Sequence, residues 1–169
     1  HPENAEKLKM LRNYGQEKRY YHRVKGFNSR LDELQAAILL VKLKHLDQWN
    51  ARRREIARIY SENITAVCVG KPNEMNYGRH VFHLYVIRHP KRADLQAYLE
   101  EEGIQTVIHY PVPIHLQEAY RDLGDGKQRF PVAEKCAGEV LSLPIFPQMR
   151  NEEVSKTAEL INHFDENPR

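Results

Sequence analysis

Residues 26–63 read GFNSRLDELQAAILLVKLKHLDQWNARRREIARIYSEN, and the rest of the chain is best understood from this stretch. After Ser29 its apolar residues recur with the period of an amphipathic helix: Leu31, Leu34, Ile38, Val41, Trp49, Ile56, Ile59 and Tyr60. Residues 27–63 contain no Gly or Pro. Ser29 with Asp32 three residues later is typical of a capping box. We therefore expect one helix over residues 29–62, roughly 50 Å long at about 1.5 Å per residue. A helix of this length usually connects two bodies.

Length, charge and cysteine content set limits on the class of protein. A chain of 169 residues is long enough for one core of ordinary size. The net charge of +3 is small and both signs are interspersed, so composition predicts neither a nucleic-acid partner nor a membrane surface. Cys68 and Cys136 are widely spaced, which suits a reducing compartment, and we find no signal peptide. We expect a cytoplasmic protein. The start at His1 in place of Met is compatible with processing or truncation.

The flanks of the helix predict further elements. Before it, a short helix over residues 2–13 should end at Gly15, and residues 16–27 show no clear period. After it, we expect strands at 80–88, 104–109 and 141–143. The expected helices are 94–102, which Gly103 stops, a turn at 117–123, one that begins at Pro131, and 152–164. A surface loop is expected at 124–126. Strands that are separated by helices predict an α+β domain in which helices cover a small sheet.

Four passages together resemble a known family: AEKLKMLRNYG (5–15), GFNSRLDELQAAIL (26–39), GIQTVIHYPVPIHLQEAY (103–120) and FPVAEKCAGEVLSLPIFPQM (130–149). In this order they are similar to the DegT/DnrJ/EryC1/StrS family of sugar aminotransferases, which are pyridoxal-phosphate enzymes of fold type I. The resemblance covers nearly the whole chain. It implies the C-terminal part of such an enzyme: a remnant of the large cofactor-binding domain (1–28), the long connecting helix (29–62), and a small domain with a short, largely antiparallel sheet covered by helices (63–169).

The resemblance also implies that part of the chemistry lies elsewhere. Members of the family carry, upstream of the AEKLKMLRN-like helix, the lysine that forms the Schiff base and a carboxylate that pairs with the pyridinium nitrogen. Those two groups give pyridoxal phosphate its electron-sink chemistry. The chain begins after both, and Lys25 lies in the approach to the helix, so we do not take it for that lysine. The 169 residues alone are expected to be inactive.

Asn28 and Arg30 are the candidate cofactor-binding residues. The resemblance implies that Asn28 reaches across a dimer interface and contacts the cofactor phosphate in the neighbouring subunit's active site. An amide donor beside the positive end of a helix would favour a phosphate there. The alternative is that Asn28 only shapes the turn before Ser29. Arg30, expected in the first helical turn, binds either a phosphate or a carboxylate of a neighbouring helix.

His109, Tyr110 and His115 are the candidate substrate-binding residues. His109 and Tyr110 stand at the end of an expected strand, where side chains leave a sheet and can face a ligand. They could bond sugar hydroxyls or pyrophosphate, and His109 could also assist proton transfer. The alternative is a pair of rim residues with polar tips in water. The spelling HYPVPIHLQEAY is most similar to members that act on nucleotide-linked 3-keto sugars, which favours substrate contact.

The resemblance thus implies a homodimeric aminotransferase with shared active sites, which moves an amino group from an amino acid, commonly glutamate, to a nucleotide-linked keto sugar. A dehydratase relative, in which another residue replaces the lysine, stays open. So does a non-catalytic helical interaction or nucleic-acid-binding module that uses the basic residues of the long helix: Lys42, Lys44, Arg52, Arg53 and Arg54. Asp47 and Glu55 interrupt that stripe, which favours a solvated face. His80 and His83 lack further ligands nearby, so we expect no metal site.

Overall fold

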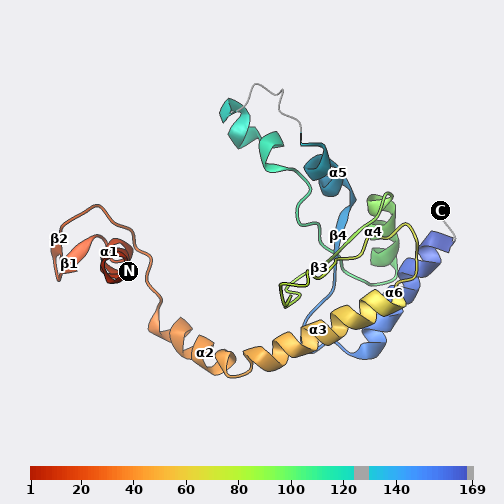
Figure 1. Ribbon diagram of the computed structural model, residues 1–169, viewed down its shortest axis with the longest axis horizontal. Coiled ribbons are helices and arrows are strands. Elements are labelled where there is room, and N and C mark those ends of the chain that lie inside the picture. Colours follow the sequence, from red (N-terminus) through yellow and green to blue (C-terminus); the bar gives the residue numbers. More distant parts are fainter. Residues whose placement is uncertain (124–129, 167–169) are drawn as a thin grey trace. The chain divides into compact units, whose positions relative to one another are not determined.

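The computed structural model describes residues 1–123 and 130–166, which form two compact units, residues 1–46 and 47–169 (Figure 1). Helices and a small antiparallel sheet confirm the α+β class. The surface loop expected at 124–126 lies outside the described residues. None of the helices in the described ranges is both long and apolar enough to span a bilayer.

The first unit contains α1 (Pro2–Arg12), a small hairpin of β1 (Gln16–Lys18) and β2 (Tyr21–His22), and α2 (Glu33–Leu43). The hairpin strands pair antiparallel, Gln16 with His22 and Lys18 with Tyr21. The sequence did not predict this hairpin. Its strands are three and two residues long and almost entirely exposed, so they carry no alternation of apolar and polar residues.

Two glycines let the chain fold back onto the end of α1. Gly15 adopts a φ of 73°, and a Cβ on Gly26 would collide with Gly15 N and Leu11 O. This close approach allows Phe27 N to donate to Leu11 O at 2.7 Å and Ser29 N to donate to Arg12 O at 2.9 Å. Residues 26–29 are therefore held by backbone hydrogen bonds against the C-terminal end of α1.

The single helix expected over residues 29–62 is wrong at its start and in its middle. The N–H of Ser29 bonds to α1, so the capping box does not form, and α2 begins at Glu33 with Asp32 at the N-cap. The chain then forms two helices, because α2 ends at Leu43 and α3 covers Leu46–Asn63. Between them His45 N donates to Lys42 O, an i to i−3 bond that interrupts the i to i−4 series. The division into residues 1–28, 29–62 and 63–169 stays a prediction.

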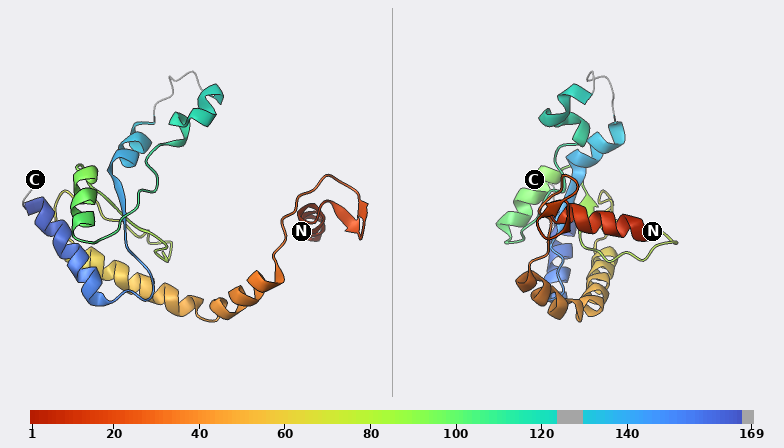
Figure 2. Two further views of the ribbon diagram at one scale, coloured as in Figure 1. Left: turned by 180° about the vertical axis from the view of Figure 1, so that it is seen from behind. Right: turned by 90° about the vertical axis from the view of Figure 1, so that its left-hand side faces the viewer.

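The core of the second unit lies between α3, α6 (Asn151–Glu166), α4 (Arg92–Glu101) and the sheet. The helices α3 and α6 lie side by side in all views (Figures 1 and 2). Asn162 of α6 supports this arrangement, because its side chain bonds to Asn63 O and to the Thr65 N–H, both at 2.8 Å. The largest fully buried side chains are Tyr60, Tyr85, Ile56, Ile64, Ile87, Leu95, Leu99, Leu141, Ile161, Val154 and Thr157. Leu95 and Leu99 are thus on the buried face of α4, and Val154 and Ile161 are on that of α6.

The sheet is smaller than predicted. β3 (Tyr85–Arg88) pairs antiparallel with β4 (Val140–Leu143). The expected strand at 80–88 is shortened because Phe82 has a φ of 49° and its N–H bonds to His80 Nδ1. The expected strand at 104–109 is wrong, because only Val107 pairs, as an isolated bridge to Ser142.

Arg52 and Arg53 of α3 tie the helix to later segments. Arg52 Nη2 donates to Met149 O at 2.6 Å and to Asn151 Oδ1 at 2.7 Å. Arg53 Nη1 donates to Ile145 O at 2.9 Å and to His83 O at 3.2 Å. The interpretation of this stripe as a solvated face is therefore wrong for these two residues, whose donors are occupied by carbonyl and amide oxygens.

Candidate functional site

Asn28 and Arg30 form a cluster with Tyr14 in the first unit. Arg30 Nε donates to Asn28 Oδ1 at 3.3 Å, and the Arg30 guanidinium carbon lies 5.5 Å from the Tyr14 ring centroid. Because the amide oxygen accepts from Arg30, the amide nitrogen of Asn28 is left to donate outward. All three residues are exposed. An amide donor next to a guanidinium is a donor set that suits a phosphate group.

This cluster owes its position to α1 and not to the start of α2. Asn28 pairs with Asn13 in an isolated bridge at the end of α1, whereas α2 begins only at Glu33. The expectation that Arg30 stands in the first turn of the helix is wrong, and so is the helix-end argument for Asn28. Tyr14 was not foreseen. Its only signal in the sequence is its place directly before Gly15.

His109 and Tyr110 lie next to β4 in the second unit. His109 Nδ1 is 2.9 Å from the hydroxyl oxygen of Ser142, and His109 is half-buried. The Tyr110 ring meets the His109 ring edge to face, with centroids 5.4 Å apart at 88°. Tyr110 itself is 73% exposed. The pair thus offers a fixed imidazole beside an accessible phenol, which suits recognition of a polar ligand.

The sequence did not single out Ser142. The segment VLSL of β4 places one hydroxyl between two leucines, and that hydroxyl reaches a histidine 33 positions earlier. The available signal is the alternation of a strand: a polar residue between apolar ones points to the opposite face. The bridge between Val107 and Ser142 brings the two segments together.

His115 is tied to α5 (Pro131–Glu139). It lies in a 3₁₀ helix, Ile114–Leu116, which a second one, Glu118–Leu123, follows. His115 Nε2 is 3.0 Å from Glu134 Oε1, and its ring centroid is 4.8 Å from that of Phe130. The structure brings His109 and Tyr110 together, but it gives His115 partners of its own in another part of the second unit.

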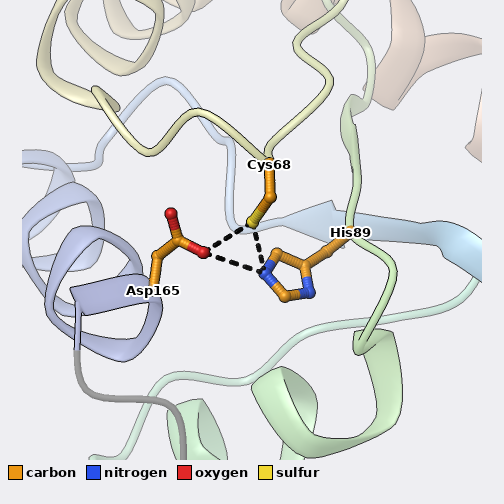
Figure 3. Close-up of side chains that lie close together, drawn as sticks. All are labelled: Cys68, His89 and Asp165. Atoms are coloured by element: carbon orange, nitrogen blue, oxygen red, sulfur yellow. Dashed lines mark hydrogen bonds and ion pairs between the residues drawn. The ribbon is translucent and has the colours of Figure 1, made fainter.

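Cys68, His89 and Asp165 converge from three separate segments (Figure 3). Cys68 Sγ donates to Asp165 Oδ1 at 2.7 Å and lies 3.0 Å from His89 Nε2. Burial and the Asp165 carboxylate raise the pKa of the Cys68 thiol to about 11. Burial lowers the pKa of His89, and the same carboxylate opposes this shift. The sequence could not predict this cluster, because Cys68 and Asp165 are 97 positions apart and belong to no spaced motif.

These three residues are of types that bind metals, but the hydrogen bonds favour a purely structural role. The Lys91 N–H donates to His89 Nδ1 at 3.0 Å, so neutral His89 carries its proton on Nε2. A metal bound at Nε2 would use the lone pair of that nitrogen, so the proton of the neutral ring would have to move to Nδ1. The Nδ1–H would then point at the Lys91 N–H, and two donors would face each other. His89 Nε2–H therefore donates to Cys68 Sγ, and the Cys68 thiol donates in turn to the Asp165 carboxylate.

Comparison with known proteins gives consistent results. A sequence model of the DegT/DnrJ/EryC1/StrS aminotransferase family matches residues 1–162. The dTDP-3-amino-3,6-dideoxy-alpha-D-galactopyranose transaminase of Aneurinibacillus thermoaerophilus is 49% identical, with 96% of this chain and 44% of that protein covered. A protein of Geobacillus stearothermophilus named pleiotropic regulatory protein is 48% identical, with 96% and 45% covered.

Solved structures agree with these matches. The crystal structure of S. venezuelae DesV is similar to this chain with a TM-score of 0.95 and 40% identity. The match covers 100% of this chain and 46% of DesV. The chain therefore spans less than half the length of the relatives it matches.

Proposed function

Because the chain belongs to the DegT/DnrJ/EryC1/StrS aminotransferase family, we propose that it is the C-terminal portion of an enzyme that transfers an amino group from glutamate to a nucleotide-linked 3-keto sugar in the cytoplasm. The observation that carries the proposal is the 49% identity to a relative whose name specifies a dTDP-linked 3-amino sugar. The match with that relative extends over 96% of this chain.

The cofactor in this proposal is pyridoxal phosphate, which supplies an electron sink for the transfer when it is bound. Asn28 and Arg30 would hold its phosphate, because the amide nitrogen and the guanidinium form an exposed donor set next to each other. Their role is binding and not proton transfer. The Schiff-base lysine is expected in the part of the relatives that the chain does not cover.

His109 and Tyr110 would hold the sugar nucleotide. The Tyr110 hydroxyl is accessible as a donor or acceptor for a sugar hydroxyl, and the His109 ring is fixed by Ser142 beneath it. His115 is a weaker candidate than these two, since Glu134 already occupies its Nε2. We further propose a homodimer with shared active sites, in which Asn28 serves the neighbouring subunit.

A non-catalytic regulatory role is the second candidate, because a relative 48% identical is named a pleiotropic regulatory protein. Binding of nucleic acid through α3 is not favoured, since Arg52 and Arg53 already donate to oxygens within the chain. A dehydratase of the same family, in which another residue replaces the lysine, is a further alternative.

The test uses the protein at its complete natural length with glutamate and two substrates, a dTDP-linked 3-keto and a dTDP-linked 4-keto deoxysugar. The proposal predicts an amino sugar from the 3-keto substrate, with the nitrogen at position 3 by NMR of the product. Amination of the 4-keto sugar alone would contradict the regiochemistry. Absence of amination together with dehydration of the sugar would favour the dehydratase, and absence of both would favour the regulatory candidate.

A further inference from the structure

Ser142 occupies a central and buried place in the sheet. It is 4% exposed, it pairs with Val86 of β3 on one side, and its N–H and C=O bond to Val107 on the other at 2.8 and 3.2 Å. Leu141 and Leu143 point into the core, so alternation directs the Ser142 side chain to the opposite face. Its hydroxyl is therefore shielded from water, and the donors and acceptors around it are fixed by the protein.

The hydroxyl has one hydrogen-bond partner in the part of the chain that the structure describes, and that partner is His109 Nδ1 at 2.9 Å. A buried hydroxyl proton needs an acceptor, because an unpaired one loses the hydrogen bond that it makes to water in the unfolded chain. If His109 donated from Nδ1, the hydroxyl proton would have none. Ser142 therefore donates to Nδ1, and neutral His109 must carry its own proton on Nε2.

The other side of the imidazole is available to a ligand. Within residues 1–123 and 130–166, His109 Nε2 has no hydrogen-bond partner. The Tyr110 ring stands at 88° to the imidazole, 5.4 Å away, and limits its rotation. The ring is thus held between a serine and a tyrosine and offers one N–H.

We propose that Ser142 is a positioning residue that holds His109 as the Nε2–H tautomer, so that His109 donates a hydrogen bond to an oxygen of the sugar nucleotide. This inference rests on the proposed function, because it takes a nucleotide-linked keto sugar as the ligand. It narrows the role of His109 to a donor: in this tautomer Nε2 has no lone pair with which to accept a proton. The acceptor is a carbonyl or phosphate oxygen.

Kinetics of the complete enzyme with its cofactor test the role through two sets of variants. Ser142→Ala should raise the KM for the sugar nucleotide about tenfold, with the glutamate half-reaction unchanged, and Ser142→Thr should restore it. In a His109→Ala background Ser142→Ala should have no further effect on KM. A full additional effect there would mean that Ser142 does not act through His109. Ser61→Ala is the matched control, because it removes another hydroxyl contact, 2.9 Å from the Tyr85 oxygen, on the core side.

Variants of His109 test the tautomer without touching Ser142. The amide nitrogen of Gln reaches the place of Nε2 and that of Asn the place of Nδ1. We therefore expect His109→Gln to retain several-fold more affinity for the sugar nucleotide than His109→Asn. The reverse order would overturn the proposal.

A spectroscopic measurement separates the inference from the proposed function. The ¹⁵N shifts of the His109 ring in the ligand-free protein should show a protonated Nε2, and Ser142→Ala should produce a mixture of tautomers. A protonated Nδ1 in an active enzyme overturns the role of Ser142. The expected tautomer in a protein that neither binds nor aminates a sugar nucleotide overturns the proposed function instead.

Discussion

His115 Nε2 lies 3.0 Å from Glu134 Oε1, and the same carboxylate oxygen accepts the Phe130 N–H at 3.1 Å. Glu134 thereby caps the N-terminal turn of α5 and connects the 3₁₀ helix that contains His115 to α5 through a hydrogen bond. One carboxylate holds both segments, so we interpret His115 first as a structural residue.

Replacement of His115 tests that interpretation. His115→Ala should lower the free energy of unfolding by about 1 kcal/mol, the usual value for one partly exposed hydrogen bond, while the KM for the sugar nucleotide stays within about twofold. His109→Ala is the comparison and should raise the KM. Urea unfolding and steady-state kinetics give the two readouts. A large rise in KM for His115→Ala with unchanged stability would show instead that His115 binds the substrate.

Arg53 should contribute more to stability than its neighbour Arg54. Arg53→Met removes donors from Ile145 O and His83 O, and the loss should be about 2–3 kcal/mol because the donor is charged. Arg54→Met should change stability by about 0.5 kcal/mol or less. Chemical denaturation measures both variants. Equal effects would mean that the contacts of Arg53 contribute nothing specific.

The Cys68–His89–Asp165 cluster should limit stability at both ends of the pH range. Because burial lowers the pKa of His89 below its ordinary value of 6.5, the unfolded chain binds that proton more readily, and stability should fall as the pH drops below 6.5. The pKa of Cys68 is raised from 9.0 to about 11, so the folded chain keeps a proton that the unfolded chain loses, and stability should fall between those values.

Urea unfolding at stepped pH measures both effects. Cys68→Ser should remove the decline between pH 9 and 10 while it keeps a hydroxyl donor for Asp165. Above pH 10 a decline should remain, because burial also raises the pKa values of Tyr60 and Tyr85 above their ordinary value of 10. Cys136→Ser is the control, because Cys136 lies in α5 and outside the cluster. A decline between pH 9 and 10 that survives in Cys68→Ser would show that another group causes it.

The chain of 169 residues should self-associate through α2. No residue of this helix is buried, and its large apolar side chains are exposed: Leu34, Ile38, Leu39, Leu40, Val41 and Leu43. Exposed apolar surface of this kind favours association. Sedimentation velocity should show oligomers of the unmodified chain. The double variant Leu34→Gln, Ile38→Gln should be monomeric. Val67→Gln, at a side chain 98% exposed, should leave them intact. A monomer at all concentrations would contradict the prediction.

Periodicity predicted α4 and α6 well. The helix expected over residues 152–164 is present as α6, with Val154, Ile161 and Phe164 buried, and Gly103, with a φ of 79°, follows α4 where it was predicted to stop the helix. In both cases the residues that form the element also form its packing face, so local pattern and tertiary burial agree.

The predictions from sequence are wrong where tertiary contacts determine the local structure. Nothing in the composition of residues 42–46 predicts the break at His45, since neither Gly nor Pro occurs there. Ser29 is a good capping residue, but its N–H is committed to Arg12. The contact between His109 and Ser142 depends on a bridge between segments that no short motif connects. The residue types of the site could thus be predicted, but not the partners that fix them.

The most direct test of the central claim is the absorbance of the protein at its complete natural length, freshly purified, before and after glutamate is added. The account predicts bound pyridoxal phosphate whose visible band disappears with glutamate and returns when a dTDP-linked 3-keto sugar follows. Asn28→Ala with Arg30→Ala should weaken cofactor binding, since both would hold the phosphate. A complete protein that binds no cofactor, or whose band does not respond to glutamate, would contradict the account.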